Sequence, residues 1–470
     1  MFSTVAVPLW LFILIVLFAA VTFASHFLFP SVRWFLRRRL ERAVERLNSR
    51  LKVPIQPFKL ASRADTVKRL IYDPEVALAV AAYAREEGVP VDVAAEAAER
   101  YAREIVPGFS AFAYFGFAIR AAKLLSQTLF RVRLVRGNDA QLEAISPEAT
   151  VIFVMNHRSN MDYVLVTWLV AERSALAYAV GEWARVWPLR QLVRALGGYF
   201  IRRRYNNALY RKVLARYVQM ATEAGITQAV FPEGGLSRTG ALGKPKLGLI
   251  SYILDGFDPG TSRDVVFVPV AINYDRVMED RNLIAAQQIG GSRFTFSIWP
   301  ILRYIKRRTL QRLAGKFHRY GYASVSFGMP LSLTAFLATP REDQPAALGE
   351  TLMARIGSVM PVPPVPFVAL AIREGLKTAE EIAQFAERET VKARAAGITV
   401  HVPRDDTAYA VSTGLRILTE RRIIADNAGR IDVLEGGEPM ISFYAASVAH
   451  LFETTVPDGE PAPQPESLTT

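Results

Sequence analysis

The chain has 470 residues, contains no cysteine and carries a net charge of +13 at neutral pH. The lack of a thiol excludes disulfides, zinc or iron–sulfur sites built on cysteine, and a cysteine acyl-enzyme. With 51% hydrophobic residues the sequence is typical of a folded protein, and its charge predicts a negatively charged partner such as nucleic acid, anionic lipid or a phosphorylated metabolite.

The N-terminal segment is apolar. Residues 1–32 contain no charged side chain, and Leu9–Phe29 is long enough to cross a bilayer as a helix. A cleaved signal peptide is the alternative, but its positive charges would come before the apolar stretch, whereas here they follow it at Arg33 and Arg37–Arg39. We therefore expect a transmembrane anchor over 1–32, with the rest of the chain on the cytoplasmic side of the cell (inner) membrane.

A helical N-terminal region is predicted over 33–135. Its first part, Glu41 to Glu104, has the pattern of charged amphipathic helices, interrupted at Gly88-Val89-Pro90. The following segment, Ile105–Ile119, is uncharged and too short to span a membrane. It can lie under the core or at a bilayer surface, and we favour the core.

From Ala149 onward, short apolar runs alternate with helical patterns. The predicted strands are Val151–Met155, Gln228–Phe231, Val265–Ile272 and Ala323–Phe327. This alternation predicts an α/β domain over 136–340, a central mixed sheet flanked by helices. The proline cluster Pro361–Pro366 predicts a linker to a small C-terminal α+β domain over 360–456, and a disordered tail is expected over 457–470.

The first predicted strand leads into a polar turn, Asn156 to Asp162, where α/β proteins commonly place their sites. Of the five histidines, His157 is the only good candidate for a general base, and Asp162 can hold its second ring nitrogen. The spacing from Ser159 to Asp162 is also that of a helix capping box, in which the carboxylate would only satisfy backbone N–H groups.

Two later segments offer groups that can bind phosphate. Gly197–Arg204 places an arginine cluster behind a Gly-Gly turn and a short apolar strand, although a solvated basic face is an equal alternative. Val230–Gly240 is a glycine-rich loop after a strand, in which Glu233 could accept a hydrogen bond from a substrate hydroxyl. Donors near this loop are Ser237, Arg238 and Lys246. The P-loop and Rossmann patterns are absent, and an ordinary glycine-rich loop is the alternative.

A fourth segment, Val266–Tyr274, is an apolar strand in which Pro269 predicts an end or a bulge, with core packing as its default role. In this order the four segments resemble the glycerolipid acyltransferase superfamily, which has an H-x4-D turn, a Gly-rich strand with Arg, an E-G-[GT]-x-S-[RT] loop and a V-P strand. The chain is most similar to the large membrane-bound glycerol-3-phosphate acyltransferases and their dihydroxyacetone-phosphate acyltransferase relatives. The stretches that carry this likeness are His157–Tyr163, Phe200–Arg203, Ser237–Gly240 and Pro245-Lys246.

The resemblance implies that His157 and Asp162 form the charge-relay pair and that Arg202 binds the acceptor's phosphate. The expected substrate-binding residues are Arg202, Arg203, Glu233, Gly234, Gly235, Ser237, Arg238 and Lys246. The family often has arginine where this chain has Leu236, so one phosphate contact is missing or is supplied by Arg203, Arg204 or Lys246.

The expected function is transfer of a fatty acyl group from acyl-CoA or an acyl-carrier protein to the sn-1 hydroxyl of glycerol 3-phosphate, at a phospholipid membrane. Dihydroxyacetone phosphate and a lysophospholipid are alternative acceptors. No cofactor, metal or nucleic acid is expected. A different class of function is a membrane-tethered module that binds nucleic acid or lipid through Arg37–Arg39, Ile305–Arg308 and Arg421-Arg422, with Ile423–Leu434 as a hairpin.

Overall fold

The computed structural model describes residues 8–10, 12–16, 38–39, 42, 44–135, 138–171, 174–181, 185–187, 189–202, 207–288, 319–395 and 402–453. It has two compact units, Ile55–Ala171 with Ala175–Thr470, and Met1–Pro54 with Glu172–Ser174. Within the described residues, no helix has both the length and the apolar character needed to cross a membrane. The predicted anchor over 1–32 lies largely outside these residues, and the predicted tail over 457–470 lies entirely outside them.

The larger unit begins with helices. These are α2 (Pro57–Leu60), α3 (Arg63–Ile71), α4 (Pro74–Glu87) and α5 (Val91–Ile105). α4 ends at Gly88 in the left-handed conformation, with φ 65°, and Pro90 precedes α5, which explains the predicted interruption. A π-helix, η1 (Phe112–Ala118), and α6 (Ile119–Leu129) follow. Tyr114 of η1 is buried, but Phe112 and Phe117 are 79% and 64% exposed, so this uncharged segment is only partly core.

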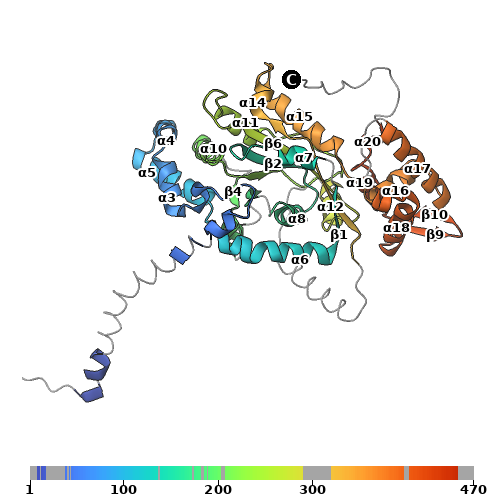
Figure 1. Cartoon of the computed structure of the whole chain (residues 1–470), viewed down its shortest axis with the longest axis horizontal. Helices are drawn as coiled ribbons and strands as arrows, with labels where there is room; N and C mark the ends of the chain where they lie inside the picture. The colour runs from blue at the N-terminus through green and yellow to red at the C-terminus, as the bar shows by residue number, and fades with distance from the viewer. Residues whose placement is uncertain are drawn as a thin grey trace, which may run out of the picture. The chain divides into compact units, whose positions relative to one another are not determined.

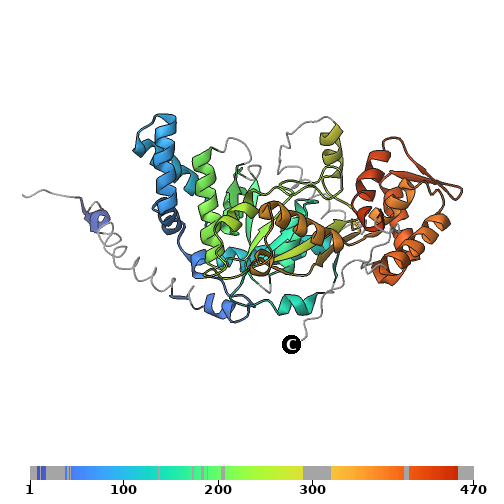
Figure 2. The same ribbon diagram turned by 90° about the horizontal axis from the view of Figure 1, so that it is seen from above.

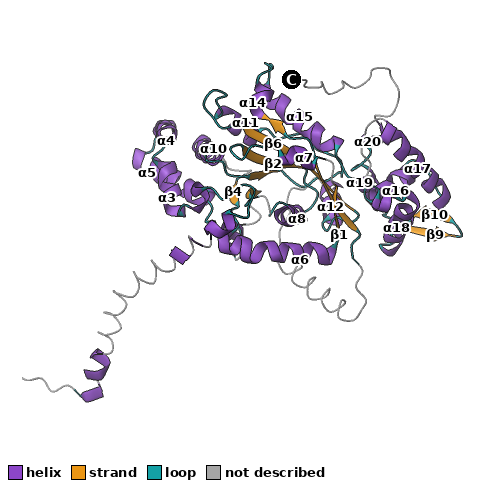
Figure 3. Ribbon diagram, viewed as in Figure 1, coloured by secondary structure: helices purple, strands orange, loops and turns teal. Residues whose placement is uncertain are grey.

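A mixed sheet forms the centre of this unit, as the sequence predicts (Figure 3). Its strands are β1 (Arg131–Val135), β2 (Thr150–Met155), β3 (Ala177–Gly181), β4 (Tyr199–Ile201), β5 (Gln228–Val230), β6 (Val265–Tyr274), β7 (Tyr322–Phe327) and β8 (Leu331–Ser332). The order is β1-β7-β6-β2-β5-β3-β4, with β8 paired to β6. The strands from β6 to β4 are parallel, whereas β7 is antiparallel to β6 and parallel to β1. The prediction of a helical region over 33–135 is therefore wrong at its end, because 131–135 pair with β7.

Central strands β2 and β6 are buried along their whole length, as expected of strands covered on both faces. The prediction that Pro269 ends or bulges its strand is wrong, since β6 continues to Tyr274. On the side of β6 away from β2, pairing with β8 reaches Phe267 and pairing with β7 starts at Val270. Pro269 lies at the change of partner, where a missing N–H breaks no ladder.

Helices cover both faces of the sheet. They are α7 (Asp139–Glu143), α8 (Met161–Leu169), α9 (Leu189–Ala195), α10 (Ala208–Glu223), α11 (Gly248–Asp255), α12 (Asp280–Gln288), α14 (Leu333–Leu337) and α15 (Gln344–Ser358). Figure 1 shows α10, α11 and α15 on one side and α6 and α8 on the other. This layering leaves the carboxyl ends of the parallel strands free to carry a site.

The C-terminal part consists of helices and one hairpin. Its elements are α16 (Pro364–Arg373), α17 (Ala379–Ala395), η3 (Pro403–Asp405), α18 (Thr407–Glu420), β9 (Ile424–Asn427), β10 (Arg430–Val433), α19 (Glu438–Ala445) and α20 (His450–Glu453). Figures 1 and 2 show these helices beside the edge of the sheet that carries β1. The proline cluster is not an exposed linker: Pro364 begins α16, and the residues around it are buried. Proline suits the first helical position because that N–H has no intrahelical partner.

The hairpin predicted within Ile423–Leu434 is present as β9 and β10. Arg421, expected on a basic binding surface, instead has a side chain only 7% exposed and pairs with Asp280 at 2.5 Å. It also donates to the hydroxyl of Tyr444 at 2.9 Å. A buried, paired guanidinium is not available to a nucleic acid or a lipid, so this contact removes part of the basis for the binding-module alternative.

Candidate active site

The turn after β2 is fixed to the neighbouring strand by its first residue. The side chain of Asn156 donates to the backbone oxygen of Ile272 at 2.9 Å and accepts from the nitrogen of the same residue at 2.8 Å. Asn156 is fully buried, so both of its amide groups must be paired inside the protein. These two hydrogen bonds hold the end of β2 against β6 and thereby fix the backbone position of the next residue, His157.

His157 and Asp162 form the pair that the sequence predicts. Nδ1 of His157 lies 3.0 Å from Oδ2 of Asp162, and the two side chains are 4% and 0% exposed. A carboxylate only accepts hydrogen bonds, so Nδ1 of the neutral ring carries the hydrogen and Nε2 carries the lone pair. Nε2 is therefore the nitrogen that can take a proton from a substrate.

Asp162 also serves the turn itself. Its Oδ2 accepts from the backbone nitrogens of Arg158 at 2.7 Å and Ser159 at 3.0 Å, while its Oδ1 accepts from the hydroxyl of Tyr274 at 2.6 Å. The contacts thus fit both interpretations of the spacing: Asp162 caps backbone N–H groups of the turn, and it also bonds to the ring as a relay pair would require. One carboxylate orients the imidazole and holds the turn in shape.

Aromatic side chains enclose the imidazole. The ring of Phe231 stacks on it with centroids 4.1 Å apart, and the ring of Tyr163 meets it edge-on at 5.4 Å. His157 as a whole is only 3% exposed. A hydroxyl that reaches Nε2 thus reacts where little water competes and where charges interact strongly.

The glycine-rich loop after β5 is bonded to the backbone of His157. Glu233 accepts from the nitrogen of His157 at 2.9 Å and, through its other oxygen, from the nitrogen of Gly243 at 3.0 Å. Burial raises the pKa of Glu233, and these two hydrogen bonds partly offset that rise. A carboxylate oxygen can accept more than one hydrogen bond, so the predicted hydrogen bond to a substrate hydroxyl stays a prediction. Glu233 positions the loop.

Of the other loop residues predicted to bind substrate, Ser237 and Gly234 shape the loop, whereas Arg238 and Lys246 expose their charges. The backbone nitrogen of Ser237 donates to the oxygen of His157 at 2.9 Å, and its hydroxyl closes the loop on Gly240 and Ala241. Gly234 has φ 67°, and the side chain of Lys246 crosses the space that a β-carbon would occupy there. The exposed cations of this loop are Arg238, Lys244 and Lys246. Gly235 is half-buried beside Gly234.

Arg202 follows β4, at the same edge of the sheet as His157, and Arg203 lies outside the described residues. Strand spacing puts the two strand ends roughly 14 Å apart, because β5 and β3 lie between β2 and β4. The guanidinium of Arg202 makes a two-pronged ion pair with Glu104, at 2.8 and 2.6 Å. That carboxylate raises the pKa of Arg202. In this conformation Arg202 contacts the helical N-terminal region and not the His157 turn.

The sequence interpretation did not identify several residues around the turn. Glu279 accepts from the hydroxyl of Ser159 at 2.8 Å and from the amide of Asn160 at 3.0 Å. Tyr274 was assigned to core packing, yet its hydroxyl reaches Asp162. Its place at the end of the V-P strand was the one available signal, because that strand neighbours β2.

Arg158 connects the turn to the C-terminal part. Its side chain is fully buried, donates to the backbone oxygen of Gly240 and lies over the ring of Phe443, 4.8 Å from the centroid. Within the described part of the chain, Nε and Nη2 of Arg158 have no hydrogen-bond partner, and burial lowers the pKa of this guanidinium. The region 335–440, which the sequence left uninterpreted, thus leads into α19, a helix that packs directly on the site.

Comparison with known proteins shows which class of protein the sequence resembles. Residues 137–273, which include the His157 turn, the glycine-rich loop and the V-P strand, match the family described as Acyltransferase. The chain is 27% identical over 430 residues to a glycerol-3-phosphate acyltransferase of Pseudomonas putida (strain W619), covering 86% of this chain and 50% of that protein. It is 28% identical over 448 residues to the protein of that name from Xylella fastidiosa (strain M23), covering 88% and 50%.

The crystal structure of a 1-acyl-sn-glycerophosphate acyltransferase from Thermotoga maritima matches 52% of this chain and 76% of its own, with 20% identity and a TM-score of 0.32. The sequence comparisons define the class: the chain carries an acyltransferase domain of the acyltransferase superfamily. Outside that domain the similarity continues, since the matches to these glycerol-3-phosphate acyltransferases cover 86–88% of this chain. The chain spans about half the length of the curated relatives it matches.

Proposed function

We propose that this protein transfers a fatty acyl group from acyl-CoA or an acyl-carrier protein to the sn-1 hydroxyl of glycerol 3-phosphate, giving lysophosphatidate, in the first step of phospholipid synthesis. The observation that supports this most is the pairing of Nδ1 of His157 with Asp162 at 3.0 Å, which leaves Nε2 as a base. The relatives are named glycerol-3-phosphate acyltransferases, and these names support glycerol 3-phosphate as the acceptor and acyl transfer as the reaction.

The proposed reaction needs no enzyme-bound acyl group. Nε2 of His157 takes the proton of the sn-1 hydroxyl while the oxygen attacks the thioester carbonyl. The tetrahedral intermediate then collapses, the carbon–sulfur bond breaks, and the thiolate leaves and takes the proton from the imidazolium to give a free thiol. Asp162 stabilises the imidazolium during this cycle, and a positioned base of this kind contributes about 10²–10⁴-fold to the rate.

The acceptor's phosphate needs cations near His157. Arg238 and Lys246 are suited to this role, because their side chains are exposed on the loop whose backbone bonds to His157. Arg202 would have to release Glu104 to take part. Leu236 replaces an arginine that the family often has, so dihydroxyacetone phosphate or a lysophospholipid remains the alternative acceptor.

We also propose that the protein acts at the cytoplasmic face of the cell (inner) membrane. The uncharged residues 1–32, followed by arginines, support this location. A membrane also suits the chemistry, since a fatty acyl donor and the lysophosphatidate product both partition into lipid.

A single assay tests the proposal. Membranes that contain the full chain are supplied with radiolabelled glycerol 3-phosphate or dihydroxyacetone phosphate, each with acyl-CoA or acyl-carrier protein. We expect lysophosphatidate from glycerol 3-phosphate and a loss of at least 10²-fold in His157→Ala. The matched control is His450→Ala, since His450 bonds to Gly357, far along the chain from the turn, and should keep its turnover. Unchanged turnover in His157→Ala would contradict the role of the base.

A further inference from the structure

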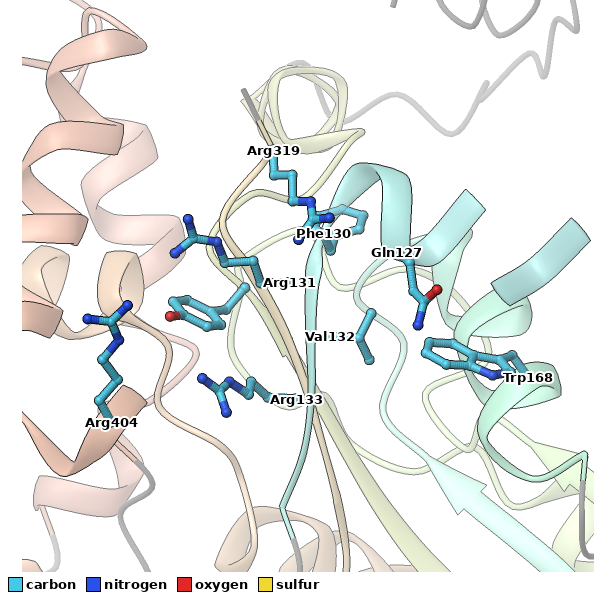
Figure 4. Close-up of a pocket in the computed structure, with 9 residues that line it drawn as sticks. Gln127, Phe130, Arg131, Val132, Arg133, Trp168, Arg319 and Arg404 are labelled. Carbon is cyan, nitrogen blue, oxygen red and sulfur yellow. The ribbon is translucent and has the colours of Figure 1, made fainter. Parts of the chain in front are cut away.

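A cleft lined by arginines lies between the sheet and the C-terminal helices. It consists of two adjoining hollows of about 570 and 670 Å³, which share Arg131, Arg319 and Tyr322. Arg133 and Arg404 line the first hollow and Arg416 lines the second. Among the residues that the structure describes, no aspartate or glutamate lines either of them. Figure 4 shows the side chains of Arg131, Arg133 and Arg404 converging on one aromatic ring.

Aromatic contacts hold these like charges together. The guanidinium carbons of Arg131 and Arg133 lie 5.9 and 5.6 Å from the ring centroid of Tyr322. Arg131 donates to the hydroxyl of Tyr409 at 2.9 Å, and Arg404 lies over the ring of Tyr409 at 4.1 Å. Clustered cations repel one another, so their placement here is built by the fold and is not that of freely moving surface side chains.

The backbone of Arg404 supports this interpretation. Its φ is 64°, the left-handed region that side chains other than glycine seldom adopt. In η3 this conformation turns the guanidinium onto Tyr409. Of the cleft's arginines, only Arg416 has a carboxylate partner among the described residues, Glu420 at 2.6 Å. The positive charge of the cleft therefore matches a ligand that brings several negative charges of its own.

The cleft opens at the edge of the sheet that also carries the catalytic pair. Arg131 and Tyr322 face each other at the starts of β1 and β7, and Ala323 of β7 faces Tyr274 at the end of β6. The hydroxyl of Tyr274 reaches Asp162. Two strand spacings, about 10 Å, separate β7 from β2, the strand that leads to His157. Trp168, near the end of α8, is also in the cleft wall.

We infer that this arginine cleft binds the phosphate groups at the nucleotide end of a coenzyme A thioester, so that the pantetheine arm carries the acyl group toward His157. The inference rests on the proposed acyl transfer. Coenzyme A bears a pyrophosphate and a 3′-phosphate at one end and the thioester at the other, and guanidinium groups bind phosphate in two-pronged fashion. The adenine ring of coenzyme A can pack on Tyr322 or Trp168.

The shape of the cleft favours a small molecule over an acyl-carrier protein. The volume of each hollow lies in the usual range of 300–1,000 Å³ for small-molecule sites, and the charges line hollows with aromatic walls. A carrier protein docks on an open surface of roughly 800 Å² per partner. The nucleotide of coenzyme A is therefore the occupant to test first.

The test is equilibrium binding of coenzyme A and of 3′-dephospho-coenzyme A to the detergent-solubilised full chain, by calorimetry. The variant is Arg133→Gln with Arg404→Gln, since neither guanidinium makes a hydrogen bond within the described residues. We expect roughly tenfold weaker binding of coenzyme A for each arginine lost, and a smaller preference over the dephospho form. The control is Arg388→Gln, which removes an exposed arginine stacked on Phe385 outside the cleft and should bind as the parent does.

Steady-state kinetics add a second measurement. The same variant should raise the KM for acyl-CoA at least tenfold and leave the KM for the acceptor unchanged. Binding of coenzyme A equal to that of the parent overturns the inference, as does an effect confined to acyl-carrier protein or to anionic vesicles. Binding needs no turnover, so the two proposals can fail separately. If His157→Ala still transfers acyl groups while the cleft variant binds weakly, the mechanism fails and the cleft stands.

Discussion

The two roles of Asp162 can be separated by comparing Asp162→Asn with Asp162→Ala. In the structure the carboxylate accepts four hydrogen bonds, from Nδ1 of His157, from the backbone nitrogens of Arg158 and Ser159, and from the hydroxyl of Tyr274. Asparagine keeps an oxygen for the three donors at Oδ2, and the hydroxyl of Tyr274 can turn to accept from the new amide. Alanine leaves all four buried donors unpaired.

These contacts set the expected magnitudes. At about 1 kcal/mol for each buried donor left without a partner, Asp162→Ala should lower the free energy of unfolding by about 4 kcal/mol. Asp162→Asn should cost about 1–2 kcal/mol, the loss of charge assistance. Both variants should lose at least 10²-fold in acyl transfer, because neither carries the negative charge that stabilises an imidazolium.

Denaturant unfolding and initial rates on the same purified preparations measure both quantities. A suitable control is Asp343→Asn, because Asp343 caps α15 through the nitrogen of Ala346. That variant should change stability by less than about 1 kcal/mol and leave turnover as it is. Full activity in Asp162→Asn would show that the carboxylate only caps the turn, and full stability in Asp162→Ala would refute the hydrogen-bond assignment.

Three further predictions concern stability. Burial raises the pKa of Asp275 to about 7, so between about pH 4 and 7 the folded state holds a proton that the unfolded chain has already released. The free energy of unfolding should therefore fall by up to about 4 kcal/mol as pH rises from about 4 to 7, and Asp275→Asn should flatten that profile. Gly240→Ala, at φ 89° with its new β-carbon against the backbone of Phe443, should cost several kcal/mol, whereas Gly375→Ala, at φ 90° with open space, should cost about 1–2 kcal/mol in the same unfolding assay. Arg202→Ala and Glu104→Gln should each lower the free energy of unfolding by about 1–3 kcal/mol and be non-additive in a double-mutant cycle; a higher KM for the acceptor in Arg202→Ala alone would restore its phosphate role.

The predictable part of the fold consists of the strands buried on both faces. β2 and β6 are nearly continuous apolar runs, and β5 and β7 are short segments with a few polar residues among apolar ones; buried strands of this kind can be recognised in a sequence. β1 was missed because it is an edge strand in which arginines alternate with apolar residues. β3 was missed because Ala177–Gly181 contains only one β-branched residue.

In the site too, contacts within one turn could be predicted from the sequence, and contacts between distant segments could not. His157 and Asp162 are five residues apart on one turn, so local spacing was enough to predict their contact. The contacts with Tyr274 and Glu279 depend on β6 lying beside β2, and no local pattern specifies the order of strands. The contact of Arg158 with Phe443 depends on how the C-terminal helices pack, which is more remote still. Ion pairing by Arg202 was missed because a charged side chain gives no sign of its partner.

The packing of α19 against Arg158 and Gly240 has a consequence for biosynthesis. The ribosome makes the chain from its N-terminus, so the His157 turn and the glycine-rich loop emerge long before residues 438–445 do. A nascent or clipped chain that stops short of Glu438 contains the His157 turn and the glycine-rich loop and yet lacks the helix that packs on them. The proposed catalytic turn should therefore gain its full support only after α19 has been synthesised.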